Sequence, residues 1–481
     1  MRKVVLALTV AMLAAAPAAQ AATKLTITGA GFGHGIGMSQ YGAYGYSLHL
    51  KDYGFILGHY YTGTTLGQLS SNPEVKVLLQ GTRRSVSFTG ALAAGAQRLD
   101  VAQTYTVRRD PAGLVLTDAS GKSVGTAPGP LRVDAAVGQP LRLFGKSVPG
   151  VRDGLYRGSL LISASGAAGV VAVNALPLED YVRGVVSGES PSAWPVEALK
   201  AQSVAARTYA ITSHAGGALF DQYADTRSQV YRGVAAETPN TDAAVQATAG
   251  QVVTYGGQPV TTYFFSTSGG ETEDVENSFV GSQPKPWLKA VDDPFDDVSP
   301  KHRWGPFRFT AKQVQSKLRR YVRGRFKRIK VLQRGVSPRV VRAQVVGTRG
   351  VTDVTGPQLR SAFGLFDTWA YFTSVTSKAS KSKTKKKAAT TTPATPASGN
   401  LTGGVAPSAR AAALGGGRVE GSIAPARAGR WLRIERRQGT RWVTAVDAKV
   451  GRAGRYSVAV PGPGVYRVVY GVATGPAVRV G

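Results

Sequence analysis

The sequence predicts an α+β protein in which a β-rich lobe and a helical lobe frame a groove, followed by a linker and a small C-terminal β-sandwich. Residues 72–175 hold a succession of short apolar segments typical of strands. Residues 176–216 carry apolar and small residues at helical spacing. Residues 374–400 contain almost no apolar residue except alanine, so they separate the larger first part from the rest.

The N-terminus, residues 1–21, has the three parts of a secretory signal peptide. Arg2 and Lys3 precede an apolar run, and Ala19-Gln20-Ala21 provides a cleavage site. The apolar run is too short to form a stable membrane span. We therefore expect a secreted protein, extracellular or associated with the cell wall. An uncleaved amphipathic anchor is the alternative.

Composition restricts the chemistry and the partners. The 481 residues include no cysteine, so disulfides and thiolate metal sites are excluded. The formal net charge of +31 indicates a polyanionic partner. Because the chain carries an export signal, anionic wall polymers or lipid head groups fit better than nucleic acid, and we expect no nucleic-acid partner.

The chain is longer than a single hydrophobic core usually serves, so we expect at least two units. Residues 22–373 form the first unit. The linker at 374–400 holds six lysines between Lys378 and Lys387, followed by TTTPATPASG, and is expected to be disordered. Residues 401–481 alternate apolar and polar residues between Gly/Pro turns, which predicts a small all-β accessory domain or a plain structural appendage.

One carboxylate stands out within the helical stretch. Glu189 follows a glycine in a Gly-Glu-Ser-Pro turn between two helical patterns, with Trp194 close behind. A glutamate at such a junction can line a cleft, although a solvated surface position is the common alternative. The second helix is expected from Pro195 to about Ser213, with Ser192 as a candidate N-cap.

The stretch LPLEDYVRGVVSGESPSAWPVEALKAQSVAARTYA, residues 176–210, resembles the stage II sporulation protein D family, also called the amidase-enhancer family. The resemblance implies a secreted enzyme that cuts the glycan strands of peptidoglycan, with Glu189 as the catalytic residue. A glutamate that protonates a glycosidic oxygen near neutral pH needs a raised pKa, and burial near Trp194 would raise it.

The expected activity is that of a lytic transglycosylase with Glu189 as single general acid/base and no cofactor. Most glycosidases use a second carboxylate. Asp180, Glu197, Asp225 and Glu271 are available, but no spacing singles one out. The alternative function is a non-catalytic enhancer of a wall amidase, with a wall-binding role.

A glycine-rich segment near the N-terminus, GAGFGHGIGMSQYGAYG, resembles a second motif of the same family. The motif normally lies towards the end of the family's domain, so its placement here is permuted. As an extended strand, its alternating glycines would leave one face as bare backbone. The resemblance makes His34, Ser39 and Gln40 candidates for substrate binding, and structural packing is the alternative for His34.

Further substrate-binding candidates come from the second helix and from two later segments. The stretches SQVYRG and YFFSTSGGETE also resemble family segments, although turn capping is an equal alternative for the serines. Arg207 is either an internal ion-pair partner or a substrate contact. The additional candidates are Trp194, Lys200, Arg207, Gln229, Tyr231, Ser266, Ser268 and Glu271. Some relatives place His and Cys just before the position of Gln229 to hold zinc; Arg227 and Ser228 stand there, so we predict no metal.

Overall fold

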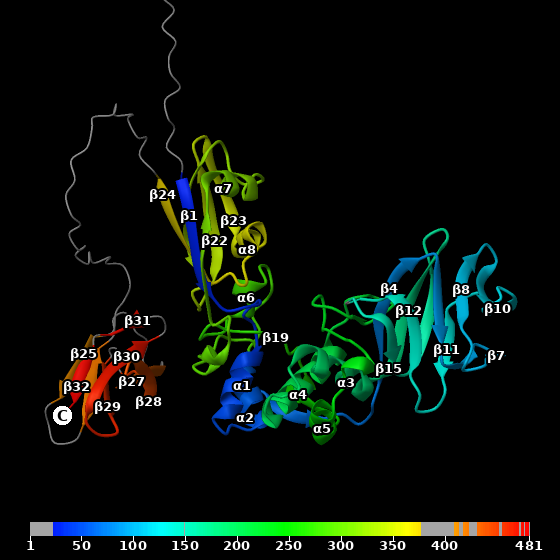
Figure 1. Ribbon diagram of the computed structural model, residues 1–481, viewed down its shortest axis with the longest axis horizontal. Helices are drawn as coiled ribbons and strands as arrows, with labels where there is room; N and C mark the ends of the chain where they lie inside the picture. The colour runs from blue at the N-terminus through cyan, green and yellow to red at the C-terminus, as the bar shows by residue number, and fades with distance from the viewer. Residues whose placement is uncertain are drawn as a thin grey trace, which may run out of the picture.

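The computed structural model describes residues 23–148 and 150–376 of the first part of the chain. Towards the C-terminus it describes residues 408–412, 417–422, 431–451, 455–470, 473–475 and 477–480. The predicted signal peptide and positions 377–400 of the predicted linker lie outside the described residues. The fold of the described part is mixed α+β, with helices α1–α8 and several sheets, which confirms the predicted class (Figure 1).

Two sheets make up the strand-rich stretch between positions 74 and 177; they are antiparallel, except that β16, from later in the chain, pairs in parallel with β4 (Figure 1). One has the strand order β10-β9-β8-β5-β12-β13 and the other β16-β4-β15-β14-β11-β6-β7. Alternation in β4 places Val75, Val77 and Leu79 in the core between them. The strands are β4 (Glu74–Arg83), β5 (Ser85–Thr89), β6 (Ala91–Ala94), β7 (Gln97–Arg98), β8 (Tyr105–Asp110), β9 (Gly113–Thr117), β10 (Ser123–Ala127), β11 (Leu131–Ala135), β12 (Leu141–Lys146), β13 (Arg152–Tyr156), β14 (Ser159–Ser165), β15 (Gly169–Pro177) and β16 (Gln222–Tyr223).

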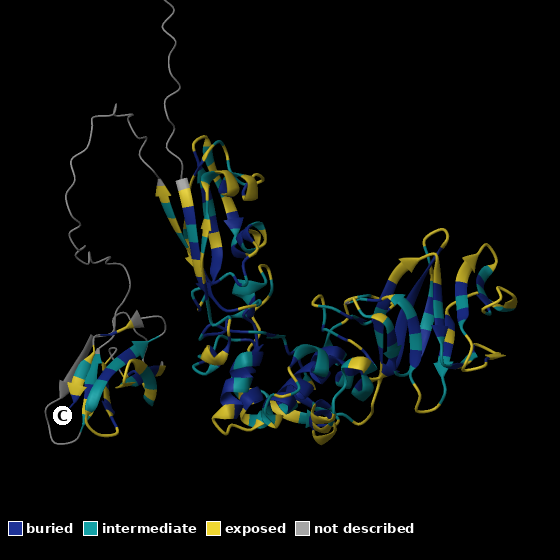
Figure 2. Cartoon of the chain, viewed as in Figure 1, coloured by how far each residue is buried: buried dark blue, intermediate teal, exposed yellow. Residues whose placement is uncertain are grey.

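The helices pack beside this stretch, and β15 runs directly into α3 (Leu178–Glu189) (Figure 1). The central helix is α4 (Val196–Thr212), which contacts α1 (Gln40–Leu48), α2 (Tyr53–Tyr60), α3 and α5 (Pro239–Ala247). Its residues from Ala198 to Ala210 are buried apart from Lys200 (Figure 2). The small side chains of this helix allow the close approach of its neighbours.

Ser192 is not the N-cap of α4, so that prediction is wrong. The N-cap is Pro195, which offers no side-chain acceptor, and the helix begins at Val196. Ser192 therefore lies three residues before the cap, in a turn where the Trp194 N–H donates to the Pro191 carbonyl at 3.0 Å. Because Pro195 is the N-cap and not the first residue of the helix, α4 begins one residue later than predicted.

The N-terminal strand and the end of the first unit meet in a further sheet. β1 (Thr23–Ala30) lies between β20 (Arg303–Phe309) and β24 (Ala370–Thr376), antiparallel to both. Nearby, β21 (Phe326–Arg334), β22 (Val340–Gly347) and β23 (Gly350–Thr355) share a core with α7 (Ala311–Lys317) and α8 (Gly356–Phe363) (Figure 1). β24 runs three residues into the predicted linker.

Short elements connect these parts. β2 (Met38–Ser39) pairs with β19 (Phe264–Phe265), and β17 (Gln251–Tyr255) lies between β3 (Thr65–Gln68) and β18 (Gln258–Pro259). The remaining short helices are α6 (Val275–Ser278), η1 (Val234–Ala236) and η2 (Asp296–Val298). No helix in the described part of the chain has the length and apolar character needed to cross a membrane.

The C-terminal part forms two antiparallel sheets around its own core. Val419, Leu432, Ile434, Tyr466 and Val468 are among the buried residues of that core. Its strands are β25 (Ser408–Ala412), β26 (Arg418–Ser422), β27 (Trp431–Gln438), β28 (Arg441–Lys449), β29 (Arg455–Ala459), β30 (Gly464–Tyr470), β31 (Ala473–Thr474) and β32 (Val478–Val480).

Candidate active site around Glu189

Glu189 is the last residue of α3, one position before the chain leaves the helix. The C-cap is Ser190, whose N–H donates to the Val186 carbonyl at 3.0 Å. Val182, Val185 and Val186 anchor the preceding turns in the core. The Glu189 carboxylate is therefore attached to a rigid helix end. Trp194 lies in the loop that follows, which runs in another direction.

Two neutral groups bind the Glu189 carboxylate. The backbone N–H of Val230 donates to Oε1 at 2.7 Å, and the side-chain amide of Gln40 donates to Oε2 at 3.3 Å. Burial raises the pKa of Glu189, and the two hydrogen bonds together with the more distant charge of Arg232 only partly oppose this effect. Among the described residues no cation forms an ion pair with Glu189, so its protonated form is favoured relative to that of an ordinary glutamate.

Gln40 reaches Glu189 because the glycine-rich N-terminal segment folds against the helices. β2 pairs in parallel with β19, placing Met38 opposite Phe264 and Ser39 opposite Phe265. The Ser39 hydroxyl caps α1 by accepting from the Gly42 N–H at 3.0 Å. Gln40, the first residue of α1, also contacts the Glu189 carbonyl at 3.4 Å. The permuted segment thus lies directly beside the carboxylate.

The prediction of an extended strand with one bare face is wrong for this segment. β1 ends at Ala30, and the following glycines take positive φ angles, including 86° at Gly35 and 71° at Gly37. A side chain at Gly37 would also lie 2.1 Å from the Tyr263 carbonyl. The glycines therefore allow a tightly turned path between β1 and β2 rather than an open edge.

His34 is held inside this turned path. Its Nδ1 accepts from the Ile36 N–H at 3.1 Å, so Nε2 is the donor to the Phe264 carbonyl at 3.1 Å. Burial, with the positive charges of Arg360 and Arg339, lowers the pKa of His34 to about 3. The ring is neutral and joins two segments of the chain.

Trp194 lies half-buried in the loop after Glu189, against two tyrosines of α1. Its ring stacks on Tyr44 with centroids 5.0 Å apart, and Tyr41 meets it edge-on at 5.0 Å. The sequence reasoning selected Trp194 but not the tyrosines. The sequence does carry a signal for them, because Tyr41 and Tyr44 are three residues apart and such residues lie on one face of a helix. The signal was missed because the segment was interpreted as a strand.

The two polar candidates of α4 have different surroundings. Lys200 forms a 2.9 Å ion pair with Glu197 one turn earlier. Arg207 is fully buried and binds both carboxylate oxygens of Glu179 at 2.7 Å. Its guanidinium also donates to the Gln251 carbonyl at 3.2 Å. These contacts are those of an internal ion pair that joins α3, α4 and β17.

Gln229 and Tyr231 flank the residue whose N–H binds Glu189, and both are buried. Gln229 donates to the Tyr181 hydroxyl at 3.2 Å and to the Ala206 carbonyl at 3.3 Å. The Tyr231 hydroxyl donates to Asn174 at 2.8 Å. They hold the segment that presents Val230, a backbone donor that no side-chain pattern could reveal.

The candidates after β19 make internal contacts. The Ser266 carbonyl accepts from the Tyr41 N–H at 2.9 Å, and its hydroxyl lies 3.2 Å from that of Thr267. Ser268 donates to Asp296 at 2.9 Å. Glu271 is buried, and its carbonyl accepts from Arg339 at 2.8 Å.

A buried acidic residue, Asp293, lies against α1. Asp293 is fully buried beside Asp296, and its pKa is raised to about 8 by burial and by that neighbouring charge. The hydroxyls of Ser39, Ser268 and Tyr60 oppose the shift. Asp293 therefore belongs to the support of α1, whose first residue contacts Glu189.

The position at which some relatives hold zinc carries a cation here. Arg227 binds both oxygens of Asp225 at 2.9 Å and lies 3.7 Å from the Tyr223 ring. The Ser228 hydroxyl accepts from the Tyr223 N–H at 3.1 Å. A guanidinium cannot act as a metal ligand, so these residues do not fit a zinc site.

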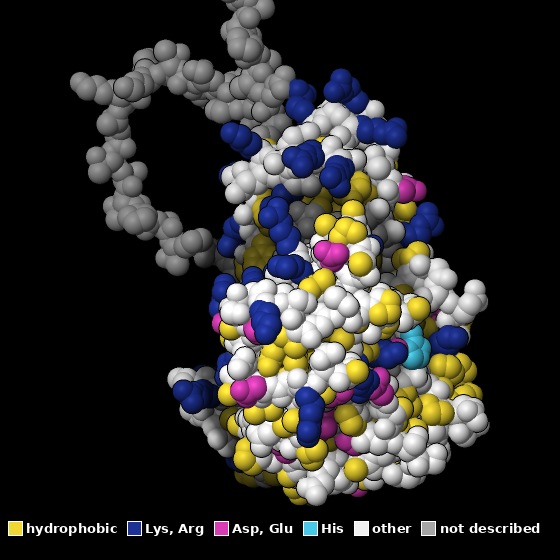
Figure 3. Space-filling model, turned by 90° about the vertical axis from the view of Figure 1, so that its right-hand side faces the viewer, with side chains coloured by type: hydrophobic (Ala, Val, Ile, Leu, Met, Phe, Trp, Pro, Cys, Tyr) yellow, Lys and Arg dark blue, Asp and Glu magenta, His cyan; other side chains and the backbone are white. Residues whose placement is uncertain are grey.

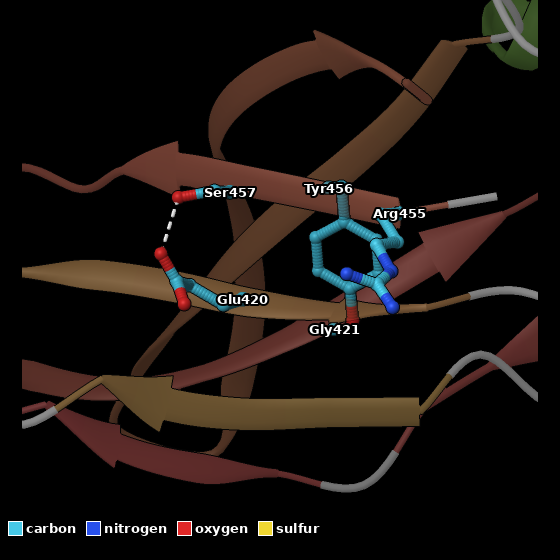
Figure 4. A pocket seen from close by; sticks show the side chains of 5 residues that line it. All are labelled: Glu420, Gly421, Arg455, Tyr456 and Ser457. Carbon is cyan, nitrogen blue, oxygen red and sulfur yellow. Dashed lines mark hydrogen bonds between the residues drawn. The ribbon is translucent and has the colours of Figure 1, made fainter. Parts of the chain in front are cut away.

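A pocket of about 490 Å³ lies elsewhere, on the C-terminal sheets (Figure 4). It is lined by Glu420, Gly421, Arg455, Tyr456 and Ser457, and Ser457 donates to Glu420 across it. None of these residues belongs to the elements that carry Glu189, so the pocket plays no part in the site described above.

Positive charge is concentrated between β20 and β23. Residues 301–352 contain sixteen lysines and arginines and no aspartate or glutamate. Lys312, Arg319, Arg320, Lys327 and Lys330 are exposed there, and among the described residues none of them pairs with a carboxylate. Figure 3 shows lysine and arginine side chains gathered on the upper part of one face of the molecule.

Comparison with known proteins identifies the region that contains Glu189. Residues 167–255 match the family model described as "Stage II sporulation protein". The stage II sporulation protein D of Bacillus subtilis is 40% identical over 168 residues, covering 31% of this chain and 47% of the relative. The Bacillus amyloliquefaciens protein of that name is 36% identical over 151 residues, or 27% and 42%.

A Bacillus subtilis protein named "Amidase enhancer" is 42% identical over 115 residues, covering 24% of this chain and 15% of the relative. The chain thus spans less than half the length of each of these relatives. The matched residues include α3, α4 and Glu189, the last residue of α3. Through residues 167–255, the chain is similar to the stage II sporulation protein family.

Proposed function

We propose that this protein is a cell-envelope enzyme that remodels peptidoglycan as a lytic transglycosylase, with Glu189 as its single general acid and base. The observation that carries the proposal is the environment of Glu189. Its carboxyl is buried, its pKa is raised, and both oxygens bind neutral donors from Val230 and Gln40. A raised pKa favours the protonated carboxyl, which is the form that can donate a proton.

The reaction needs no water. Glu189 donates its proton to the glycosidic oxygen, and the bond from that oxygen to the anomeric carbon breaks. The resulting carboxylate then takes the proton of the primary hydroxyl of the same sugar, whose oxygen bonds to the anomeric carbon. The products are a new free hydroxyl end and a 1,6-anhydro end, and Glu189 is protonated again.

The surroundings of other acids support a single-residue mechanism. Asp180 lies nine residues earlier on α3, about 13 Å along the axis, beyond the roughly 5–9.5 Å that separates paired glycosidase carboxylates. It is also near Arg157 and Arg183. Glu197 pairs with Lys200, and Asp225 binds Arg227.

The glycan strand lies, in this proposal, along the predicted groove between the strand-rich and helical parts, across the end of α3. The basic surface at residues 301–352 retains the protein on anionic wall polymers. The negative charges of a phosphate-rich polymer attract the lysines and arginines of this surface. Binding to intact walls is then expected to fall as salt rises and after chemical removal of the anionic polymers.

The test is mass spectrometry of the products after the purified protein meets peptidoglycan strands with and without stem peptides. Ends that lack one water, formed by the parent and not by Glu189→Gln, would support the transglycosylase. Ordinary reducing ends would replace it with hydrolysis, which requires a second carboxylate and a water. Strand cleavage retained by Glu189→Gln would contradict the assignment of the acid.

The similarity to the protein named "Amidase enhancer" favours a second candidate, a wall-binding protein that stimulates a separate amidase. That role tolerates the loss of Glu189. Incubation of a wall amidase with the parent or with Glu189→Gln separates the two functions. Equal stimulation by both proteins, with no new glycan ends, would favour the enhancer.

A further inference from the structure

Three aromatic side chains, from α1 and from the loop that follows Glu189, form a compact cluster. Tyr44 and Trp194 stack with an interplanar angle of 25°, and Tyr41 meets Trp194 at 69°. The centroids of the two tyrosine rings are 6.4 Å apart. All three residues are half-buried, so each ring is held by its neighbours and still reaches the surface.

Both halves of this aromatic cluster are tied to the proposed acid. Tyr41 directly follows Gln40, whose amide contacts Glu189, and its N–H is fixed by the Ser266 carbonyl at 2.9 Å. Trp194 follows Glu189 by five residues, which limits their separation to about 17 Å. The cluster is therefore joined to the surroundings of Glu189 through α1 on one side and through the loop after the glutamate on the other.

Among the described residues, the polar tips of the cluster have no protein partner. In the part of the chain that the structure describes, no hydrogen bond is made by the Tyr41 hydroxyl, the Tyr44 hydroxyl or the Trp194 indole N–H. These atoms are also not among the buried unpaired ones, so solvent reaches them. By contrast, the buried Tyr231 places its hydroxyl on Asn174 at 2.8 Å. Aromatic packing that serves only the core satisfies its polar atoms inside the protein.

We propose that Tyr41, Tyr44 and Trp194 form the binding site for one N-acetylhexosamine ring of the glycan, adjacent to the bond that Glu189 cleaves. The apolar C–H face of a pyranose packs on an aromatic surface, and its hydroxyl and amide groups meet the three free polar tips. This inference rests on the proposed glycan substrate. It adds the residues that position the sugar.

Binding is measured in the Glu189→Gln background, so that turnover does not consume the probe. The probe is a soluble tetramer of N-acetylglucosamine, titrated by calorimetry into the full chain. Trp194→Ala and Tyr44→Ala are each expected to weaken binding about tenfold. Trp431→Ala, which removes a partly exposed tryptophan of the C-terminal part, is the matched control and is expected to leave the affinity unchanged.

Tryptophan fluorescence provides a second readout that does not need the alanine variants to fold. The tetramer is expected to shift the emission of the parent and of Trp431→Phe, but not that of Trp194→Phe. Unchanged affinity in Trp194→Ala and Tyr44→Ala would overturn the aromatic site and leave the transglycosylase standing. Aromatic-dependent binding without any Glu189-dependent cleavage would keep the site and overturn the enzyme. A full chain that does not bind the tetramer would also overturn the aromatic site, while cleavage of peptidoglycan strands still decides the transglycosylase.

Discussion

The backbone N–H of Val230 binds Oε1 of Glu189 at 2.7 Å, across 41 positions of the chain. A backbone N–H can only donate, so Oε1 must act as an acceptor and cannot point a proton towards Val230. The other oxygen, Oε2, has only the longer 3.3 Å contact from Gln40. The shorter bond at Oε1 therefore favours Oε2 as the oxygen that carries the proton when Glu189 is protonated.

The Glu189→Gln variant is expected to be more stable than the parent at high pH. Because burial raises the pKa of Glu189 above its usual value, the parent keeps its full stability below about pH 4.5 and loses part of it as pH rises through the higher folded-state pKa. Glutamine does not ionise, so the difference in Tm should grow between pH 5 and pH 8. Thermal unfolding across this range checks the sign, and a difference that is independent of pH would contradict it.

Replacement of Gln40 by leucine should move the alkaline limit of activity to higher pH. The amide of Gln40 donates to the carboxylate and lowers the pKa of Glu189, so its loss raises that pKa further. The maximal rate should also fall, because Oε2 loses its only side-chain donor. Profiles of rate against pH test both effects. Gln333→Leu, at an exposed position of β21, is the control and should leave the profile unchanged.

Arg207→Met should destabilise the fold by about 3 kcal/mol. The change removes a fully buried guanidinium and leaves Glu179 without its cation. Arg227→Met removes an ion pair with Asp225 in which the arginine is half exposed, and should cost about 1 kcal/mol or less. Denaturant unfolding of the two variants gives the comparison. Similar losses from both changes would contradict the structural role assigned to Arg207.

Gly42→Ala and Gly58→Ala should have opposite effects. A methyl group at Gly42 would lie 1.9 Å from the Tyr60 hydroxyl and 2.3 Å from Asp293, so α1 would have to move away from its support. Gly58 lies in α2 with no atom near its added methyl, and alanine there should stabilise the helix by about 0.5–1 kcal/mol. Melting temperatures measure both effects, and a neutral Gly42→Ala would show that α1 can shift freely.

Asp293→Asn is expected to flatten the dependence of stability on pH. The pKa of Asp293 is raised from 3.8 to about 8, so the folded parent holds a proton that the unfolded chain has released. Stability then falls between these values by about 1.4 kcal/mol per pH unit and is lowest above pH 8. The variant should show a smaller slope than the parent in unfolding experiments from pH 5 to pH 9. An unchanged slope would place the titration on another group.

The sequence predicted the elements whose signals are local. The strand-rich stretch, the two helices around Glu189 and the central position of the alanine-rich helix follow from patterns that span a few turns. The contact of Gln40 with Glu189 joins residues 149 positions apart, and Val230 contributes through its backbone, so neither has a local signature. The turned path of Gly31–Gly37 was taken for a strand because alternating glycines fit both conformations until φ angles are known.

The N-terminal strand has a consequence for how the protein is made. β1 pairs with β20 and β24, so its partners leave the ribosome some 280 to 350 residues later. The sheet around β1 is therefore complete only after synthesis has passed Thr376. A fragment limited to residues 167–255 would contain the family match and the glutamate, yet it would lack Gln40 and the support of α1. In the proposed function, the site around Glu189 therefore depends on segments that lie well outside the matched region.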